Sequence, residues 1–509
     1  MRSSRTPFEN GAAGMTPRRR ASRVSAVLRR VFGVSELRPG QRAVIDAVLA
    51  GQHTLAIMPT GAGKSLCYQV PALLMPGMTV VVSPLIALMR DQFDKLSGLG
   101  LQAVQVNSAV PADDIRRARA RIGRRAVEFV FTTPEQLAGH ELRPLLGRDA
   151  VDLLVIDEAH CISQWGHDFR PAYLDALSRL SAFGSPTVLA LTATATPDVI
   201  ADIERQLGLG ALRVINTGAY RPNLAYHVRP VSSDADKQRQ LVEIVRGAEG
   251  ATVVYAATVR HVDALHALFR AEGLAATAYH GRLRAQSRAE AQDAFMTGAV
   301  PTIIATNAFG LGIDKPDIRT VVHYDLPASL DVYYQESGRA GRDGEPADCI
   351  LLFQRRDRGL QRFFMAGRYP TLDDFTALVD GLRAAPAAGA LTLDEIRTRT
   401  PTLSAGKRRV MLSALKQAQM IRERRGATYE LRPEALAASI EPLVAAYEER
   451  RQRDQAKLEQ MVVYAQTALC RARVLLEALG ETAEWSQCGS CDNCRGLAVR
   501  SEAVAVGAA

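Results

Sequence analysis

Short apolar runs rich in β-branched residues alternate with helical stretches along most of this 509-residue chain, and this alternation is the strongest constraint on the fold. Strands that are apolar along their whole length are buried on both faces, which is typical of parallel sheets covered by helices. The alternation occurs twice, over residues 24–213 and 214–355, and predicts two tandem α/β domains. The runs are HTLAIMP (53–59), TVVVSP (79–84), VEFVFTTP (127–134), VDLLVIDE (151–158) and TVLALTAT (187–194), followed by ATVVYA (251–256), PTIIATN (301–307), RTVVHYD (319–325) and ADCILLF (347–353).

A different pattern follows residue 355. Residues 370–435 predict three helices followed by a strand–turn–strand around Gly426, an order typical of a winged helix. Residues 440–496 predict a long helical hairpin that leads into a cysteine cluster. The three helices of the winged-helix segment are expected near 372–384, 392–399 and 404–421.

The positive charge of the chain is concentrated in two short islands. Lysine and arginine number 63 against 54 acidic residues, a net charge of +9. Residues 1–30 carry +7 and residues 397–432 carry +8, so the rest of the chain is net −6. We expect disordered tails at 1–23 and 497–509. The second island lies on the winged-helix segment and predicts a surface that binds a polyanion.

Composition excludes several protein classes. Hydrophobic residues make up 47% and charged residues 23%, which excludes a disordered chain or a collagen-like fibre. No apolar run reaches the length of a transmembrane helix, and the basic N-terminus lacks the apolar stretch of a secretory signal. We therefore expect a cytoplasmic protein with no membrane partner.

The segment PTGAGKS (59–65) predicts a phosphate-binding loop, because it follows an apolar strand and precedes a helix. Glycines let backbone N–H groups approach phosphate oxygens, Lys64 places a cation on the β- and γ-phosphates, and Ser65 is suited to ligate Mg²⁺. An incidental glycine turn is the alternative. The nucleotide-binding residues expected here are Thr60, Gly61, Ala62, Gly63, Lys64 and Ser65.

Two further segments supply the side chains that phosphoryl transfer to water requires. VIDEAH (155–160) ends an apolar strand with Asp157, which fits a Mg²⁺ partner, and Glu158, which fits a base that activates water. In the second domain, Arg339 and Arg342 stand three residues apart between glycines and could act as arginine fingers. Taken alone, these arginines could equally be surface turn residues.

Four cysteines near the C-terminus predict a metal site. Cys470, Cys488, Cys491 and Cys494 have the spacing C-x₁₇-C-x₂-C-x₂-C, and four thiolates close a tetrahedral Zn²⁺ site. An iron–sulfur cluster and a redox switch are the alternatives.

Long ordered stretches of the chain resemble the RecQ-type DNA helicases of superfamily 2. They include FGVSELRPGQ (32–41), MPTGAGKSLCYQVPAL (58–73), DEAHCISQWGHDFRPAY (157–173), ATNAFGLGIDKPDIRTVVHYDLP (305–327), YYQESGRAGRDGEPA (333–347) and CRARVLLEALGE (470–481) with CGSCDNC (488–494). The resemblance implies an ATP-dependent helicase that moves 3′ to 5′ on single-stranded DNA and unwinds duplexes in repair and recombination. It also implies a branch of the family with the winged helix before the zinc module and without a helical HRDC domain.

The resemblance assigns roles to particular residues. Arg38 and Gln41 are expected to contact adenine, and Gln335 joins Arg339 and Arg342 in the catalytic set. Trp165, Phe169 and Arg170 lie in an aromatic-rich loop that is expected to sense DNA by base stacking. On the winged helix, the candidate DNA-contacting residues are Arg408, Arg409, Arg424 and Arg425.

The expected cofactors are ATP, Mg²⁺ and Zn²⁺, and the expected partner is single-stranded or forked DNA at the nucleoid, with single-strand-binding or repair proteins as further partners. Three alternatives remain open: an RNA helicase or remodeller, a DNA-stimulated ATPase or translocase without processive unwinding, and a DNA-binding scaffold. A winged helix that contacts protein is also an alternative to one that contacts DNA.

Overall fold

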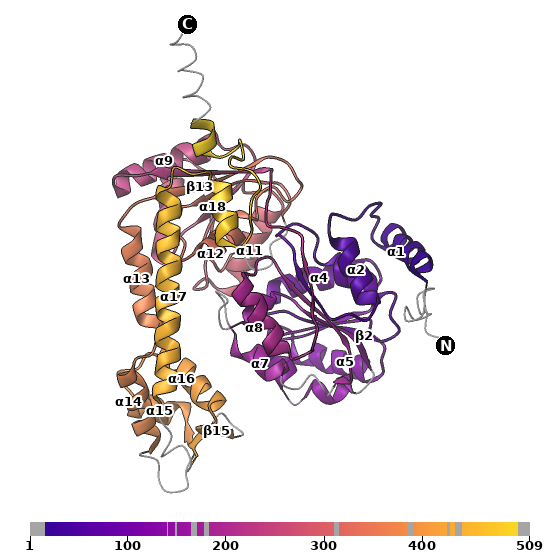
Figure 1. Ribbon diagram of the computed structural model, residues 1–509. Helices are drawn as coiled ribbons and strands as arrows, with labels where there is room; N and C mark the ends of the chain where they lie inside the picture. Colours follow the sequence, from indigo (N-terminus) through magenta and orange to yellow (C-terminus); the bar gives the residue numbers. More distant parts are fainter. Residues whose placement is uncertain are drawn as a thin grey trace. The chain divides into compact units, whose positions relative to one another are not determined.

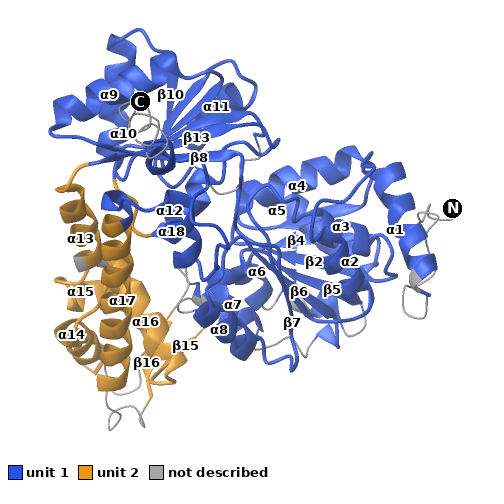
Figure 2. Ribbon diagram, turned by 45° about the horizontal axis from the view of Figure 1, so that its top comes forward, with its two compact units in different colours: residues 1–325, 330–353, 464–509 blue, residues 326–329, 354–463 orange. Residues whose placement is uncertain are grey.

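A computed structural model describes residues 16–139, 141–147, 150–163, 170–177, 183–309, 315–383, 390–424, 428–432 and 440–496 (Figure 1). The chain divides into two compact units (Figure 2). Unit 1 comprises Met1–Asp325, Leu330–Phe353 and Tyr464–Ala509, and unit 2 comprises Leu326–Ser329 and Gln354–Val463. Among the described helices, none has the length and apolar character needed to cross a membrane.

The first domain of unit 1 is built on a seven-stranded sheet in which every pair of neighbours is parallel, with the order β3-β4-β2-β5-β6-β1-β7. Its strands are β1 Thr54–Ile57, β2 Met78–Val82, β3 Ala103–Val106, β4 Phe129–Thr132, β5 Val151–Ile156, β6 Thr187–Thr192 and β7 Arg213–Asn216. Its helices are α1 Pro17–Val31, α2 Gln41–Leu49, α3 Leu66–Ala72, α4 Ile86–Gly98, α5 Ala112–Gly123, α6 Pro134–Ala138, α7 Pro171–Leu177 and α8 Pro197–Leu207, with 3₁₀ turns η1 Arg143–Leu146 and η2 Ala159–Ile162.

The first sheet is buried on both faces, as its apolar strands predict. Successive side chains of a strand point to opposite faces, so Leu55 and Ile57 of β1 join one core and Ala56 joins the other. Residues of α1 to α4 complete the second core, and residues of α5 to α8 complete the first. The predicted parallel α/β fold is confirmed.

Two expected boundaries of the first domain are wrong. Residues 17–23 belong to helix α1 rather than to a disordered tail, because Val24, Val27 and Leu28 give this arginine-rich helix a buried face. The first sheet also extends past residue 213, since the edge strand β7 pairs with β1 as far as Asn216, which lies opposite Ile57. The expected tail at 497–509 and residues 1–15 lie outside the described part of the chain.

The second domain of unit 1 has a six-stranded parallel sheet with the order β10-β11-β9-β12-β13-β8. This confirms the predicted second α/β domain. Its strands are β8 Leu224–Pro230, β9 Ala251–Tyr255, β10 Ala276–Tyr279, β11 Thr302–Ala305, β12 Ile318–His323 and β13 Ala347–Phe353, and its helices are α9 Asp234–Gly247, α10 Val259–Ala271, α11 Ala285–Met296 and α12 Leu330–Ser337.

Within unit 2, helices α14, α15 and α16 and a small sheet follow the order of a winged helix. The sheet is antiparallel with the order β14-β16-β15, and the helices pack around a core that includes Phe375, Leu378, Met411 and Leu415. A capping box at Thr392 starts the second helix. The elements are α13 Asp357–Arg368, α14 Leu372–Arg383, β14 Leu391–Thr392, α15 Leu393–Arg399, α16 Ala405–Gln417, β15 Ile421–Arg424 and β16 Thr428–Leu431.

Two helices precede the last cysteines: α17 Glu441–Gln466 and α18 Arg471–Ala478. Most of α17 is grouped with unit 2, whereas α18 and the cysteines are grouped with unit 1. The segment predicted as one module at 440–496 is thus divided between the two units near Val463.

Candidate nucleotide site and metal centre

The phosphate-binding loop connects the buried strand β1 to helix α3. Gly61 and Gly63 have φ of +86° and +76°, a left-handed backbone conformation that residues with a Cβ rarely adopt. Lys64 is half-buried and its Nζ donates a hydrogen bond to Met58 O at 3.2 Å. Burial lowers the pKa of Lys64, and the carboxylates of Glu158 and Asp157 oppose this shift. The loop therefore holds a cation beside two carboxylates, which fits the phosphates and metal of a bound nucleotide.

Arg38 and Gln41 lie against this loop. Gln41 Nε2 donates to Ala62 O at 3.1 Å and to Gly63 O at 2.8 Å, and the Arg38 guanidinium donates to Gly61 O. Gln41 is in turn held by the Arg38 backbone N–H, which donates to Gln41 Oε1 at 2.7 Å. Both residues thus support the phosphate-binding loop in addition to the adenine contact that we predict for them.

Gly63→Ala is expected to weaken binding of ADP by at least about tenfold, because a left-handed backbone costs alanine about 1–2 kcal/mol and the new Cβ would stand 2.5 Å from Gln41 Nε2. Gly51→Ala is the matched control, since Gly51 has φ of +75° but no atom within 4 Å of the added Cβ. Isothermal titration with ADP measures both variants. Equal ADP affinities in the two variants would contradict the prediction.

The acidic pair lies at the end of β5, beside β2. Asp157 N donates to Val82 O at 2.9 Å, and Asp157 Oδ2 accepts from Ser83 Oγ at 3.2 Å. Burial and, next, the neighbouring Glu158 raise the pKa of Asp157 to about 7. Glu158 has φ of +51°, which is strained for a residue with a side chain. Such strain clusters at functional sites, and here it lies at the residue expected to act as the base.

His160 is a site residue that our reading of the sequence did not single out. Its Nδ1 lies 3.4 Å from Glu158 Oε2 and 3.1 Å from Thr192 Oγ1. Thr192 Oγ1 donates to Thr194 O at 2.9 Å. His160 therefore links the expected base Glu158 to Thr192, the last residue of β6. The strand periodicity gives no indication of this link, because the two segments are 32 residues apart.

The arginine-containing loop of the second domain reaches the phosphate-binding loop. A Cβ on Gly61 would lie 3.3 Å from Arg342 Cγ, so the Arg342 side chain stands directly over this glycine. Arg339 is buried near the hydroxyl of Tyr255. Burial raises the pKa of Tyr255 to about 12, and the positive charge of Arg339 partly opposes this rise. Gln335 is half-buried on α12, and its catalytic role stays a prediction.

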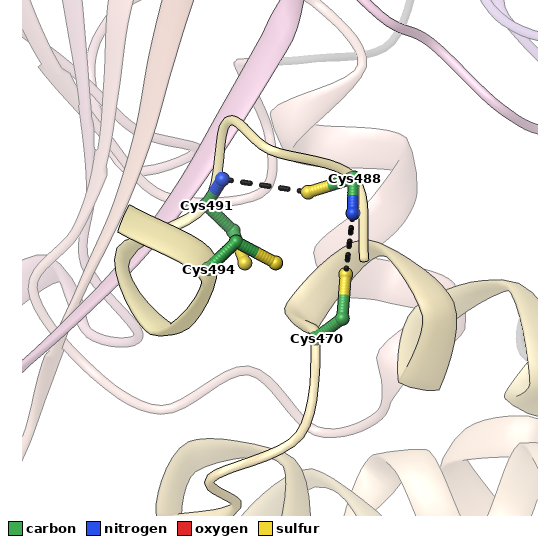
Figure 3. Close-up of side chains that lie close together, drawn as sticks. All are labelled: Cys470, Cys488, Cys491 and Cys494. Atoms are coloured by element: carbon green, nitrogen blue, oxygen red, sulfur yellow. Dashed lines mark hydrogen bonds between the residues drawn. The ribbon is translucent and has the colours of Figure 1, made fainter. Parts of the chain in front are cut away.

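The four clustered cysteines converge on one point (Figure 3). Their sulfur atoms all lie within 4.8 Å of one another. This upper limit is close to the separation of about 3.8 Å between thiolates bound to one tetrahedral zinc. Backbone N–H groups of Cys488 and Cys491 donate to the sulfurs of Cys470 and Cys488 at 3.3 and 3.4 Å. These donors stabilise thiolates, so the donor set fits zinc.

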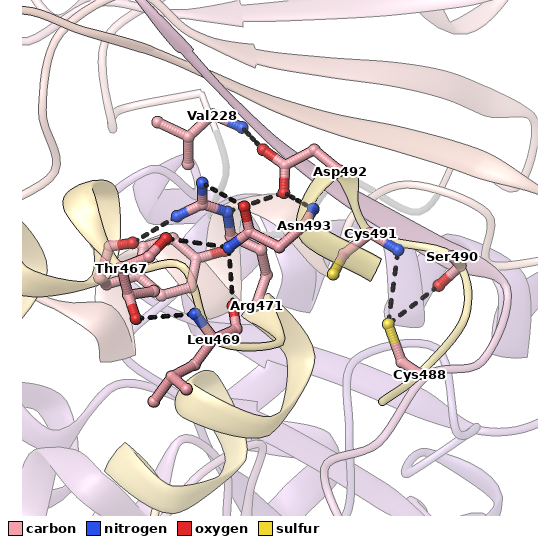
Figure 4. Close-up of polar contacts among 10 residues, drawn as sticks. Val228, Thr467, Leu469, Arg471, Cys488, Ser490, Cys491, Asp492 and Asn493 are labelled. Atoms are coloured by element: carbon pink, nitrogen blue, oxygen red, sulfur yellow. Dashed lines mark hydrogen bonds and ion pairs between the residues drawn. The ribbon is translucent and has the colours of Figure 1, made fainter. Parts of the chain in front are cut away.

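A buried arginine holds the cysteine loop in place (Figure 4). Arg471 donates from Nε to Asp492 Oδ1 at 2.9 Å and from Nη1 to Tyr464 O at 2.6 Å. Asp492 Oδ2 accepts from Val228 N of β8 at 2.8 Å. Because Asp492 lies between Cys491 and Cys494, this network joins the metal site to the second sheet.

Arg471→Gln is expected to destabilise the cysteine module by about 3 kcal/mol, because it removes the buried partner of a partly buried ion pair and leaves Asp492 poorly compensated. Arg473→Gln is the matched control on the same helix. Arg473 forms an exposed pair with Glu477, and such pairs contribute less than about 1 kcal/mol. Urea unfolding compares the two variants. Equal midpoints would contradict the prediction, because the Arg471 contacts would then stabilise the module no more than an exposed ion pair does.

Sequence comparisons agree with this geometry. The chain matches the DEAD/DEAH box helicase family over residues 38–203, the helicase conserved C-terminal domain over 236–344 and the RecQ zinc-binding family over 415–495. The probable ATP-dependent DNA helicase RecS of Bacillus subtilis is 38% identical over 343 residues, which cover 67% of this chain and 68% of that protein. The chain belongs to the RecQ family of superfamily 2 helicases.

Other relatives of this RecQ-type chain are longer. The ATP-dependent DNA helicase RecQ of B. subtilis is 42% identical over 347 residues, covering 67% of this chain and 58% of that protein. The chain spans little more than half the length of this and similar relatives. The helicase Lhr of Mycobacterium smegmatis, solved with ssDNA and AMP-PNP, has a TM-score of 0.56 and 23% identity, covering 82% of this chain and 61% of that chain. This likeness shows a shared fold.

The structure describes only the end of the aromatic-rich loop that is expected to contact DNA. Trp165 and Phe169 lie outside the described residues. Arg170 is half-buried, and its guanidinium donates to Pro84 O at 3.3 Å. Pro84 lies between β2 and α4, so Arg170 joins the end of the aromatic-rich loop to the segment that follows β2.

The structure corrects one DNA-contact prediction on the winged helix. Arg408 lies on the buried face of α16, where its Nη1 donates to Thr400 O at 2.8 Å and Oγ1 at 3.1 Å. The prediction that Arg408 contacts DNA is therefore wrong. Arg409 is exposed, and Arg424 is exposed while pairing with Glu430. Arg425 lies outside the described residues.

Proposed function

We propose that this RecQ-type chain is an ATP-dependent DNA helicase that moves 3′ to 5′ on single-stranded DNA and unwinds duplexes during repair or recombination. The observation that carries the proposal is Arg342 of the second domain standing over Gly61 of the phosphate-binding loop. A site completed by side chains of two domains can couple hydrolysis to relative movement of those domains. The names of the RecQ and RecS relatives, both ATP-dependent DNA helicases, support the choice of DNA.

The geometry supports a proposed role for each residue of the site. Bound ATP supplies the γ-phosphoryl group that is transferred to water. Lys64 neutralises phosphate charge, and Ser65 and Asp157 are the proposed ligands of Mg²⁺. Glu158 orients the attacking water and accepts its proton, and Arg342 stabilises the charge that develops on the phosphoryl oxygens.

The proposal extends to the cellular location of the protein, its partners and the metal that it binds. We propose that it acts at the nucleoid in the cytoplasm, because its substrate is chromosomal DNA and its RecQ and RecS relatives include bacterial proteins. Single-strand-binding and repair proteins are the proposed partners, since they occupy the same DNA intermediates. Zn²⁺ is the proposed occupant of the four-cysteine site, supported by the match to the RecQ zinc-binding family.

Strand displacement tests the proposal. Duplexes with a 3′ tail, a 5′ tail or no tail are incubated with ATP and Mg²⁺, beside an RNA duplex of the same sequence. Displacement of the 3′-tailed DNA alone supports the proposal. DNA-stimulated ATP hydrolysis without displacement would favour a translocase or remodeller, and displacement of the RNA duplex would overturn the choice of DNA.

A further inference from the structure

An arginine in the segment between the two sheets makes contacts that its position in the sequence does not predict. Arg221 follows β7 and precedes β8, and it is half-buried. Its Nη1 donates to Thr60 O at 3.0 Å and to Gly338 O at 3.1 Å. Its Nη2 donates to Ala340 O at 3.0 Å and to Gly341 O at 2.6 Å. One guanidinium thus satisfies four main-chain carbonyls.

These carbonyls belong to the two loops that meet at the nucleotide site. Thr60 immediately precedes Gly61 in the phosphate-binding loop, whereas Gly338, Ala340 and Gly341 lie in the loop that carries Arg342. The two loops approach closely, since a Cβ on Gly338 would stand 3.5 Å from Thr60 Cβ. The Arg221 guanidinium therefore holds both loops at the place where they face each other.

Asn223 also binds the backbone of the arginine-containing loop. It accepts a hydrogen bond from Arg221 Nε at 3.3 Å, and its Nδ2 donates to Gly341 O and Glu345 O, both at 2.8 Å. Gly341 has φ of +53°, and a Cβ at this position would collide with the Asn223 amide. The backbone just before Arg342 is thus closely surrounded by Arg221 and Asn223.

We propose that Arg221 is a positioning residue that sets the Arg342 guanidinium against the phosphate-binding loop and so controls the rate of ATP hydrolysis. Arg221 need not touch the nucleotide for this role, because it acts on the backbone on both sides of the site. The inference rests on the ATP hydrolysis proposed above. A planar guanidinium with five donors can serve several carbonyls in one plane, whereas a lysine ammonium cannot keep this geometry.

The test is a double-mutant cycle on the full chain. Wild type, Arg221→Gln, Arg221→Lys, Arg342→Gln and Arg221→Gln/Arg342→Gln are compared by single-turnover ATP hydrolysis with DNA present and enzyme in excess, which keeps slow rates measurable. ADP affinity and thermal unfolding are measured for each protein. Arg213→Gln is the matched control, since Arg213 lies on β7 and donates at 2.8 Å to the exposed Gln52 side chain.

The expected result is a fall of about 10- to 100-fold in the hydrolysis rate for both Arg221 variants, with ADP affinity changing less than about threefold, as misplacement of a catalytic group predicts. The double variant should match Arg342→Gln, because Arg221 acts through Arg342. Arg213→Gln should match wild type.

Other outcomes overturn the inference. An unchanged rate in Arg221→Gln, a wild-type rate in Arg221→Lys or an additive loss in the double variant would show that Arg221 does not act through Arg342. Loss of folding or of ADP binding in both Arg221 variants would make Arg221 a general structural residue. If wild type itself shows no ATP hydrolysis, the proposed function fails, and this outcome is distinguishable from failure of the Arg221 variants alone.

Discussion

Lys64→Ala is expected to lower the rate of DNA-stimulated ATP hydrolysis by at least about 10²- to 10³-fold, because it removes a cation held at the site where charge develops. The loss should exceed a simple effect of net charge. Lys64 is half-buried, and two carboxylates stand close enough to oppose the lowering of its pKa. Without the ammonium group, the repulsion of the incoming phosphates by Asp157 and Glu158 would be less well compensated.

A coupled assay of ATP turnover at saturating single-stranded DNA measures this effect. Arg246→Ala is the control, since it removes one positive charge from the exposed surface of α9, where Arg246 pairs with Glu272. The control should retain the wild-type rate. A Lys64→Ala protein that keeps more than about a tenth of the wild-type rate would contradict the assignment of this loop, because a missing phosphate contact costs far more.

Cys491→Ser is expected to eliminate bound zinc and to lower the unfolding temperature of the cysteine module by about 10 °C. Cys491 is fully buried, and its sulfur is one of four that converge. A serine hydroxyl stays protonated near neutral pH and replaces a thiolate ligand poorly, so the remaining three cysteines bind the metal weakly. The Arg471 network would remain, but the loop between Cys488 and Cys494 would lose its central support.

Zinc content of the purified protein, measured by atomic emission, checks this prediction together with thermal unfolding. Cys349→Ser is the matched control. Cys349 is equally buried on β13, where its sulfur faces Ser337 O at 3.6 Å, and it lies outside the cluster. It should keep one zinc per chain even if it loses some stability. Full zinc content in Cys491→Ser would refute the four-cysteine site.

Sequence patterns were most informative where the relevant contacts are local or periodic. The apolar runs predicted both parallel sheets, because a strand buried on two faces must be apolar throughout. The spacing of the cysteines predicted their convergence, since CxxC motifs place sulfurs on one side of a tight loop. The glycines of the phosphate-binding loop predicted a close approach of the backbone to phosphate, and Gly61 and Gly63 both have a left-handed backbone.

Predictions failed where an amphipathic or edge element carries many polar residues. The sequence predicts a disordered tail for residues 17–23, because Ala, Ser and Pro accompany the arginines there. These residues instead begin helix α1, in which Val24 and Val27 are fully buried. Arg408 was expected on a DNA-facing surface because it stands in a basic run. Its place on α16 instead turns it toward Thr400, where it satisfies buried oxygens.

The amino-acid sequence by itself determined the two α/β domains, the phosphate-binding loop, the acidic pair and the cysteine cluster, because each depends on residues that are near in the chain or repeat with a fixed period. Only the tertiary structure decided which distant groups meet. Arg221 and Thr60 are 161 residues apart, and Arg221 and Gly338 are 117 apart. Contacts of this kind depend on how the loops at the ends of two sheets are brought together, and no local pattern records that.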